Sequence, residues 1–227
     1  MSEDFEENRL KEIAAQLSCP AGEKGVKTAE NMAVNNDGMT RLAVSAIDLV
    51  KDDVVLEIGP GNGSHVSGIL KGFKHVLYYG VDISELMVTE AQKLNKGVQG
   101  ADFSLSDGHQ LNFADEFFSK VFTVNTIYFW KDPEGYLKEI FRVLKPAGML
   151  SVAFGAKEFM AGLAFTKYGF NLYSSDEVCQ LLTNAGFEIN GVKRAMEQVR
   201  SNGGGMVNRE VVVVSGLKSK KQTPSQA

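Results

Sequence analysis

Stretches rich in apolar, β-branched and aromatic residues recur along the chain, and helical patterns separate them. This alternation is typical of βαβ units, which build a parallel sheet covered by helices on both faces. A run that is apolar at nearly every position, such as 53–58, fits a strand buried on both sides. The expected strands lie at 53–58, 76–81, 101–105, 120–125 and 149–154, and the expected helices between them lie at about 64–71, 84–95 and 133–143.

The last part of the chain departs from this alternation. A helix is expected over 174–186, because serines stand at its start and a glycine follows its last turn. Two β-rich stretches, 187–199 and 207–217, flank the glycine-rich segment 201–205 and predict an antiparallel hairpin. We therefore expect an α/β fold with a doubly wound, mostly parallel, seven-stranded sheet that ends in an antiparallel hairpin.

The residues before the first strand have helical patterns. Apolar residues share one helical face in 5–17, and a second helix is expected over 26–34. Polar residues and a glycine at 35–38 interrupt this pattern, and a further helix is expected over 39–50. The expected division of the chain is an N-terminal helical cap at 1–40, an α/β domain at 41–217 and a polar, disordered tail at 218–227.

Composition limits the kinds of partner. The net charge is −4, whereas nucleic-acid-binding proteins usually carry a basic surface, so we expect no nucleic acid. No apolar signal segment follows the acidic N-terminus, and no apolar run approaches the roughly 20 residues that span a bilayer. Cys19 and Cys179 lie far apart, and the three histidines have no metal-binding spacing. We expect a cytoplasmic protein with reduced thiols, no membrane span and no bound metal.

A glycine-rich turn follows the first expected strand. Gly59, Gly61 and Gly63 alternate, and Glu57 stands two positions before the first of them. Glycines allow positive φ and a close approach of ligand to backbone, and a nucleotide-like ligand at this strand end is usual for the topology. Dinucleotide binding favours GxGxxG, but here the third glycine comes one position early. Three alternating glycines have no evident packing reason, so we favour a ligand site over a bare turn.

Acidic residues follow the next two expected strands. Asp82, followed by Ile83, ends the second strand, and Asp107 and Gly108 follow the third. One carboxylate can accept hydrogen bonds from two hydroxyl groups. The alternatives are an N-cap role for Asp82 and an ordinary turn at Asp107 and Gly108.

These features resemble class I S-adenosylmethionine-dependent methyltransferases of the small-molecule, ubiquinone-biosynthesis type. The pattern ExGxGxG at 57–63 and LKEIFRVLKPAG at 137–148 carry the resemblance, which extends over roughly 40–216. It implies a Rossmann-like methyltransferase fold over 41–217, with S-adenosyl-L-methionine as cofactor and S-adenosyl-L-homocysteine as product. Ala147 departs from the family, where glycine is usual.

The resemblance also assigns roles within the cofactor site. Asp82 would take both ribose hydroxyls, Ile83 would pack on the adenine face, and Asp107 would accept from the adenine amino group. The cofactor-binding residues that it implies are Glu57, Gly59, Gly61, Gly63, Asp82, Ile83, Asp107, Gly108 and Asn125.

The segment after the fourth strand bears on the acceptor. Nucleic-acid and glutamine methyltransferases carry [D/N]PPY here, but both prolines are missing after Asn125. We therefore expect a small organic acceptor, bound by the segments 18–40 and 155–173, the second acting as a substrate lid. The residues expected at this acceptor site are Met32, Asn35, Asn36, Met39, Phe159, Phe165, Tyr168, Phe170 and Tyr173.

No catalytic group can be assigned from the sequence. Methyl transfer needs alignment and exclusion of water, and a base only if the acceptor must lose a proton early. Tyr128 and Trp130 are candidates, with core packing as their alternative. His65 and His109 are bases by residue type, with solvated loop positions as their alternative. A nicotinamide-dependent oxidoreductase and a non-catalytic S-adenosylmethionine-binding protein are the other functions considered, and the protein could be a monomer or a homodimer.

Overall fold

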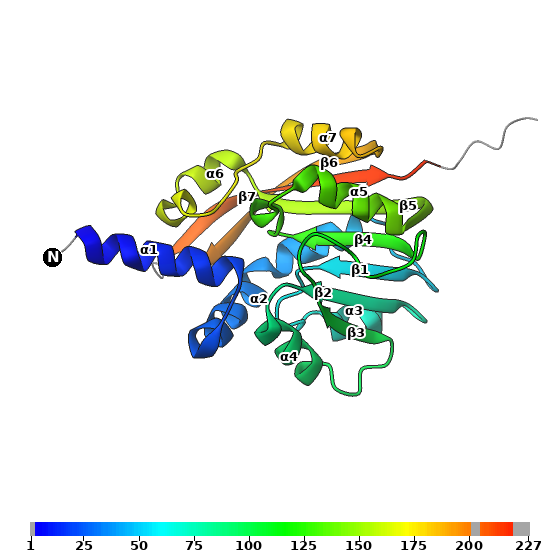
Figure 1. The fold of residues 1–227 in the computed structure, drawn as a ribbon, viewed down its shortest axis with the longest axis horizontal. Coiled ribbons are helices and arrows are strands. Elements are labelled where there is room, and N and C mark those ends of the chain that lie inside the picture. The colour runs from blue at the N-terminus through cyan, green and yellow to red at the C-terminus, as the bar shows by residue number, and fades with distance from the viewer. Residues whose placement is uncertain (1–2, 201–204, 220–227) are drawn as a thin grey trace, which may run out of the picture.

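The computed structural model describes residues 3–200 and 205–219. Its centre is a seven-stranded sheet in the order β3-β2-β1-β4-β5-β7-β6, with helices on both faces (Figure 1). The strands are β1 (Val54–Ile58), β2 (Leu77–Asp82), β3 (Ala101–Leu105), β4 (Phe118–Val124), β5 (Leu144–Gly155), β6 (Glu188–Arg200) and β7 (Met206–Leu217).

The strand pairing confirms the predicted fold class. β1 pairs in parallel with β2 and β4, and these pair in parallel with β3 and β5. β7 runs antiparallel between β5 and β6, which makes the terminal hairpin. β5 begins at Leu144, five residues before the predicted start at residue 149. Leu144 pairs with Phe118 of β4, and the register between the two strands shifts after this pair.

The helices alternate with the parallel strands. Local signals define two of them: the Asp132 carboxylate caps α5 by accepting from the Gly135 N–H at 2.9 Å, and Ser174 and Glu177 form a capping box at α7. The helices are α1 (Glu3–Ser18), α2 (Gly22–Ser45), α3 (Val66–Gly72), α4 (Glu85–Leu94), α5 (Pro133–Val143), α6 (Lys157–Ala161) and α7 (Ser175–Asn184), and short 3-10 turns lie at η1 (Ile127–Phe129) and η2 (Ala164–Lys167).

Successive residues of the central strands enter two separate hydrophobic cores. Leu56 and Val121 belong to the core that contains α5 and α7. Their neighbours Val55 and Phe122 belong to the core that contains residues of α2, α3 and α4. The alternation follows from the two-residue period of a strand, and it explains why these strands are apolar at nearly every position.

The predicted helix break at 35–38 is wrong. α2 runs without interruption from Gly22 to Ser45 and therefore continues across the expected boundary at residue 40. Residues 46–50, expected as helix, lie in a turn and the segment after it. The division into a cap and a domain stays a prediction.

Contacts with the hairpin explain why α2 continues. The Asn35 side chain donates to the carbonyl of Arg200 at 3.1 Å and accepts from its N–H at 3.3 Å. Arg209 donates to the carbonyl of Asn35 at 2.6 Å. A Cβ at Gly38 would collide with the carboxylate of Glu197, so a glycine lets the helix approach the hairpin. Polar residues that usually form local turns therefore have partners far away in the sequence.

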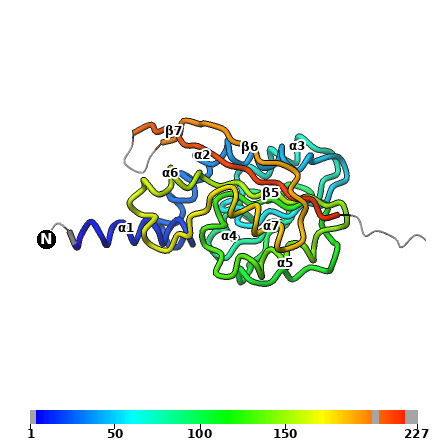
Figure 2. The backbone as a smooth tube through the Cα atoms, turned by 90° about the horizontal axis from the view of Figure 1, so that it is seen from above, coloured from blue at the N-terminus to red at the C-terminus, as the bar shows by residue number. Residues whose placement is uncertain are grey.

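The β6–β7 hairpin is long and reaches past the parallel strands. Figure 2 shows its far end at the same end of the molecule as α1 and α6. The predicted turn residues 201–204 of this hairpin lie outside the described residues.

The predicted disordered tail begins too early at residue 218. The Lys218 ammonium group donates to the carbonyls of Phe141 and Leu144, each at 2.7 Å. These carbonyls lie at and just beyond the last turn of α5, where helical partners are missing and a cation is favourable. Lys218 is therefore part of the folded structure, and the remaining tail residues 220–227 lie outside the described residues.

Candidate active site

A cavity of about 640 Å³ lies at the carboxyl ends of the parallel strands. β1 is flanked by β2 on one side and β4 on the other, which makes this edge a switch point where ligands bind in open α/β sheets. The loops after β1 to β4 form one wall of the cavity. The other walls come from α1, α2, the segment 159–170 and the hairpin.

The three glycines of the turn after β1 have different roles. Each has positive φ, but a Cβ on Gly61 would meet nothing within 4 Å. A Cβ on Gly59 would collide with the Thr126 side chain, and one on Gly63 would lie 3.1 Å from Ala91 and Phe103. Two of the glycines therefore have a packing reason that the sequence did not reveal, and Gly61 is the one that leaves open space in the cavity wall.

Asp82 holds the turn against the end of β2. Its carboxylate accepts from the N–H of Gly61 at 3.1 Å and from the N–H of Ser84 at 2.9 Å. Burial raises the pKa of Asp82 to about 6, although these N–H groups lower it. Ser84, whose hydroxyl accepts from Met87, is the N-cap of α4, so the alternative N-cap role of Asp82 is wrong.

Ile83, Asp107 and Gly108 form a slot beside Asp82. The Ile83 side chain lines the cavity and is 44% exposed, which is high for an apolar residue at a strand end. Gly108 has φ +74°, and a Cβ there would lie 3.3 Å from Ile83. The exposed Asp107 carboxylate accepts from the N–H groups of His109 and Gln110, each at 2.8 Å, and these bonds lower its pKa. Asp107 therefore shapes a turn and also lines the slot.

Glu57 lies beneath the glycine turn. It is 1% exposed, and its carboxylate accepts from the Tyr78 hydroxyl and is hydrogen-bonded to the His65 Nε2 at 2.7 Å. Burial alone would lower the pKa of His65, but the charge and hydrogen bond of Glu57 raise it. His65 is therefore a paired residue that joins α3 to β1, and the solvated alternative for it is wrong.

Asn125 follows β4 with an unusual backbone. Its φ is +58°, a left-handed conformation that asparagine adopts more readily than most other residues apart from glycine. Its side chain donates to Asn36 of α2 at 3.0 Å and accepts from the Tyr128 hydroxyl at 3.3 Å. Asn125 thus connects the strand edge to the N-terminal helices.

Tyr128 and Trp130 line the cavity, but both side chains are mostly buried. The Tyr128 hydroxyl accepts from the N–H of Gly155 at 2.7 Å, and burial raises its pKa well above the usual range. The Trp130 ring packs edge-on against Tyr136 with 5.1 Å between ring centroids. Core packing, the alternative considered for both residues, therefore describes much of their environment. His109 is exposed at the cavity wall.

The end of the cavity away from Asp82 is apolar and aromatic. Met32, Asn35, Asn36, Phe159, Phe165 and Phe170 line the cavity, as predicted for an acceptor site. Of the other residues expected there, Met39 lies in the core, the Tyr168 ring faces Lys11 and Tyr173 packs against the core.

Two parts of the cavity wall are not predicted by the sequence. α1 contributes Ile13 and Leu17, although the predicted site began only after α1. The hairpin contributes Arg209, which is 8% exposed and paired with Glu197. The sequence gives one signal for a buried charge in this strand: Arg209 and Glu210 stand directly before four consecutive valines.

The described residues contain neither a metal-binding cluster nor a membrane-spanning helix. No group of three or more His, Cys, Asp or Glu side chains there is placed to hold a metal ion. Each helix within 3–200 and 205–219 is too short or too polar to cross a bilayer. The expected cytoplasmic location, the absence of nucleic acid and the choice between monomer and homodimer stay predictions.

The sequence of this protein is similar to those of known methyltransferases. A family model described as "Methyltransferase domain" matches residues 56–152. The uncharacterized methyltransferase YdaC of Bacillus subtilis is 30% identical over 138 residues, which cover 60% of this chain and 75% of YdaC. The ubiquinone/menaquinone biosynthesis C-methyltransferase UbiE of Desulfotalea psychrophila is 33% identical over 94 residues, which cover 41% of this chain and only 38% of UbiE.

A solved structure shows the same fold. The complex between the Haloferax volcanii Trm112 methyltransferase activator and a methyltransferase contains a chain that matches with a TM-score of 0.72 and 17% identity, covering 86% of this chain and 94% of that chain. Together with the family model and YdaC, this likeness identifies the class. The protein belongs to the class I S-adenosylmethionine-dependent methyltransferase family.

Replacing Gly61 tests whether its open space receives the cofactor. A methyl group in Gly61→Ala should lower the affinity for S-adenosylhomocysteine by roughly ten- to a hundredfold, the scale of overpacking a filled site. Gly97→Ala is the matched control, because Gly97 has φ +86° and equally open surroundings but does not line the cavity. Isothermal titration calorimetry measures both affinities. Equal affinities in the two variants would contradict a ligand at Gly61.

The pKa of Asp82 predicts how cofactor binding depends on pH. The ionised carboxylate can accept from one ribose hydroxyl on each oxygen, whereas protonation turns one oxygen into a hydroxyl donor; below pH 6 the free protein carries mostly the protonated form. Between pH 7 and pH 5, affinity for S-adenosylhomocysteine should therefore fall by about tenfold. Asp82→Asn should bind more weakly at pH 7 and lose this dependence, which separates Asp82 from the titration of His65. A variant with the full pH dependence would refute the assignment.

Proposed function

We propose that this protein transfers the methyl group of S-adenosyl-L-methionine to a small organic acceptor and releases S-adenosyl-L-homocysteine. The observation that carries the proposal is one continuous cavity that joins the glycine turn and Asp82 to an aromatic end. Its volume of about 640 Å³ lies in the usual range for small-molecule sites, about 300–1,000 Å³.

The residues at the strand ends fit an adenosyl group. Gly61 leaves space where any side chain would stand in the cavity. Each Asp82 oxygen accepts one N–H bond, so each has a further lone pair for a ribose hydroxyl. The half-exposed Ile83 offers apolar surface to a purine ring, and the glycine at 108 leaves no side chain beside it.

The chain's contribution to the reaction is placement. When bound, the cofactor supplies a methyl group activated by a sulfonium. Asp82 and the glycine turn hold the adenosyl part, and the walls around the aromatic end hold the acceptor in line and exclude water. Tyr128 does not act as a base, because burial raises its pKa and keeps the hydroxyl protonated. His109 directly follows the residues proposed to hold the adenine, so it is not assigned as a base for an acceptor at the aromatic end.

An apolar, ring-bearing acceptor fits the aromatic end best. Phe129 and Phe170 pack edge-on with 4.6 Å between centroids, and Phe165 lies 5.7 Å from Phe170. Such rings bind apolar and planar groups well. The name of the UbiE relative, a ubiquinone/menaquinone C-methyltransferase, supports the same class of acceptor.

A binding and turnover experiment tests the proposal and its two alternatives. S-adenosylhomocysteine at a hundred times its dissociation constant should stabilise the protein by about 2.7 kcal/mol in thermal unfolding, and NADH should not. With methyl-labelled S-adenosylmethionine and a cell extract, label should enter the organic-solvent-soluble fraction. Stabilisation by NADH alone would favour an oxidoreductase. Binding of S-adenosylhomocysteine without any transfer would favour the non-catalytic alternative, and label only in protein or nucleic acid would refute a small acceptor.

A further inference from the structure

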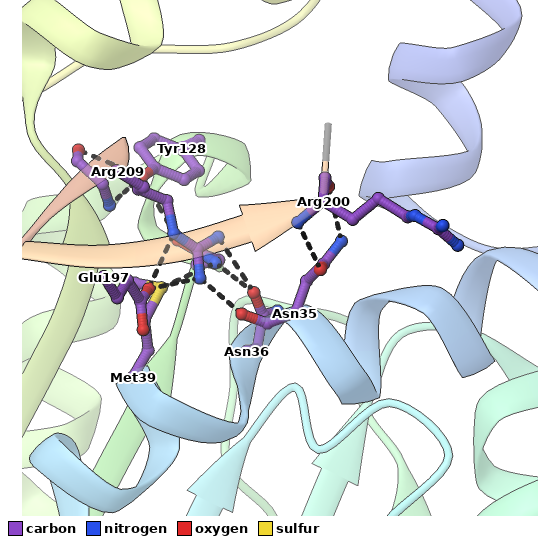
Figure 3. Close-up of polar contacts among 9 residues, drawn as sticks. Asn35, Asn36, Met39, Tyr128, Glu197, Arg200 and Arg209 are labelled. Carbon is purple, nitrogen blue, oxygen red and sulfur yellow. Dashed lines mark hydrogen bonds and ion pairs between the residues drawn. The ribbon is translucent and has the colours of Figure 1, made fainter. Parts of the chain in front are cut away.

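A network of polar residues crosses the cavity wall between the aromatic end and the strand edge. Figure 3 shows Arg209 of β7 placed between Glu197 of β6 and the residues Asn35 and Asn36 of α2, while the Arg200 side chain points away. Arg209 is 8% exposed and its side chain would be costly to bury without partners. The network therefore holds a charged group in a fixed position beside the acceptor end.

One N–H donor of Arg209 has no acceptor among the described residues. A guanidinium group has five N–H groups. The Nε donates to Glu197 at 2.8 Å, and the Nη2 donates to Glu197 and, at 2.6 Å, to the carbonyl of Asn35. The Nη1 donates once, to the Asn36 Oδ1 at 3.3 Å. Within the described residues the second Nη1 hydrogen has no acceptor.

Asn36 adds two further N–H donors to the same cavity wall. Its Oδ1 accepts from both the Arg209 Nη1 and the Asn125 Nδ2, the latter at 3.0 Å. These two donors fix the orientation of the amide, so the Nδ2 end must point away from them. The Asn36 Nδ2 has no partner among the residues that the structure describes.

Arg209 and Asn36 both line the cavity. In the described part of the chain, the only fully buried side-chain nitrogen or oxygen without a partner is the Ser151 Oγ, so the Asn36 Nδ2 is not sealed in the protein. Arg209 is 8% exposed, and its guanidinium group lies in the cavity wall. The charge of Arg209 is balanced by Glu197, so the pair offers directed N–H groups more than a net positive charge.

We propose that Arg209 and Asn36 bind an oxygen of the acceptor, so that the acceptor class is an apolar, ring-bearing molecule with a carbonyl or carboxylate group. The proposal rests on the proposed function, because it names the ligand of the same cavity. The body of the molecule lies against Phe129, Phe165 and Phe170, and its oxygen accepts from the Arg209 Nη1 and the Asn36 Nδ2. Asn125 connects these donors to the loop whose Thr126 packs on Gly59, so the oxygen is held close to the cofactor turn.

Three naphthalene probes test the proposal on protein saturated with S-adenosylhomocysteine. 2-Acetonaphthone has a carbonyl, 2-naphthoate has a carboxylate, and 2-ethylnaphthalene has a similar size without an oxygen. Equilibrium titration should give at least about tenfold tighter binding for one or both oxygen-bearing probes than for the hydrocarbon, as expected for hydrogen bonds with a charged donor. Tighter binding of the ketone would indicate an acceptor with a neutral carbonyl oxygen, and tighter binding of the naphthoate would indicate an acceptor with a carboxylate. Equal binding of all three would overturn the proposal.

Variants assign the effect to the two residues. Asn36→Asp keeps the oxygen that accepts from Arg209 and Asn125 but replaces the free donor by an acceptor. It should remove most of the preference for oxygen-bearing probes and leave binding of 2-ethylnaphthalene unchanged. Asn31→Asp is the matched control, because it adds the same charge on the same helix and also lines the cavity, without a bond to Arg209. Arg209→Met should likewise remove most of the preference for oxygen-bearing probes. A variant that distorted the cavity would instead weaken the binding of all three probes together.

The outcomes separate this inference from the proposed function. Failure of S-adenosylhomocysteine to bind the wild-type protein contradicts the proposed function itself. Normal binding of S-adenosylhomocysteine, together with an unchanged oxygen preference in Asn36→Asp and Arg209→Met, contradicts only the role of these two donors.

Discussion

The Asp82 carboxylate connects the parts of the molecule that make a binding site. It lies where β1 and β2 end side by side, and it accepts from the Gly61 N–H in one loop and the Ser84 N–H in the next. Burial makes this ionised group costly, so the backbone donors and any bound hydroxyl groups compensate for lost hydration. The open space at Gly61 and the slot beside Ile83 both depend on the loop positions that this carboxylate fixes.

A second buried charge organises the acceptor end. The pair of Arg209 and Glu197 belongs to the hairpin, yet Arg209 also bonds to the carbonyl of Asn35 in α2. The Ser84 hydroxyl donates to the Pro20 carbonyl at 2.6 Å and ties the start of the same helix to the loop after β2. α2 is therefore fixed at both ends of the cavity, which explains how N-terminal residues far from the sheet in sequence complete its wall.

The sequence predicts the features that depend on local patterns, such as the strands and their ends. It does not predict the features that depend on contacts between distant parts of the chain. The alternation of apolar stretches with helical patterns predicts the sheet, and the strand ends locate Gly61 and Asp82. At Asn35 and its neighbours the sequence wrongly predicts a helix break, because their partners in the hairpin have no local signature. Only the packing of Thr126 on Gly59 and of Phe103 on Gly63 distinguishes these glycines from Gly61. The partners of Arg209 likewise could not be read from a strand taken alone.

One cavity is proposed to hold the adenosyl group at Asp82 and the acceptor at the aromatic end. A crystal structure of the protein with S-adenosylhomocysteine would show where each part of the ligand lies. Both ribose hydroxyls should lie within hydrogen-bonding distance of the Asp82 carboxylate, about 2.5–3.0 Å, and the sulfur should face Asn125 and the aromatic wall. A ligand bound elsewhere, or one whose ribose makes no contact with Asp82, would contradict this arrangement.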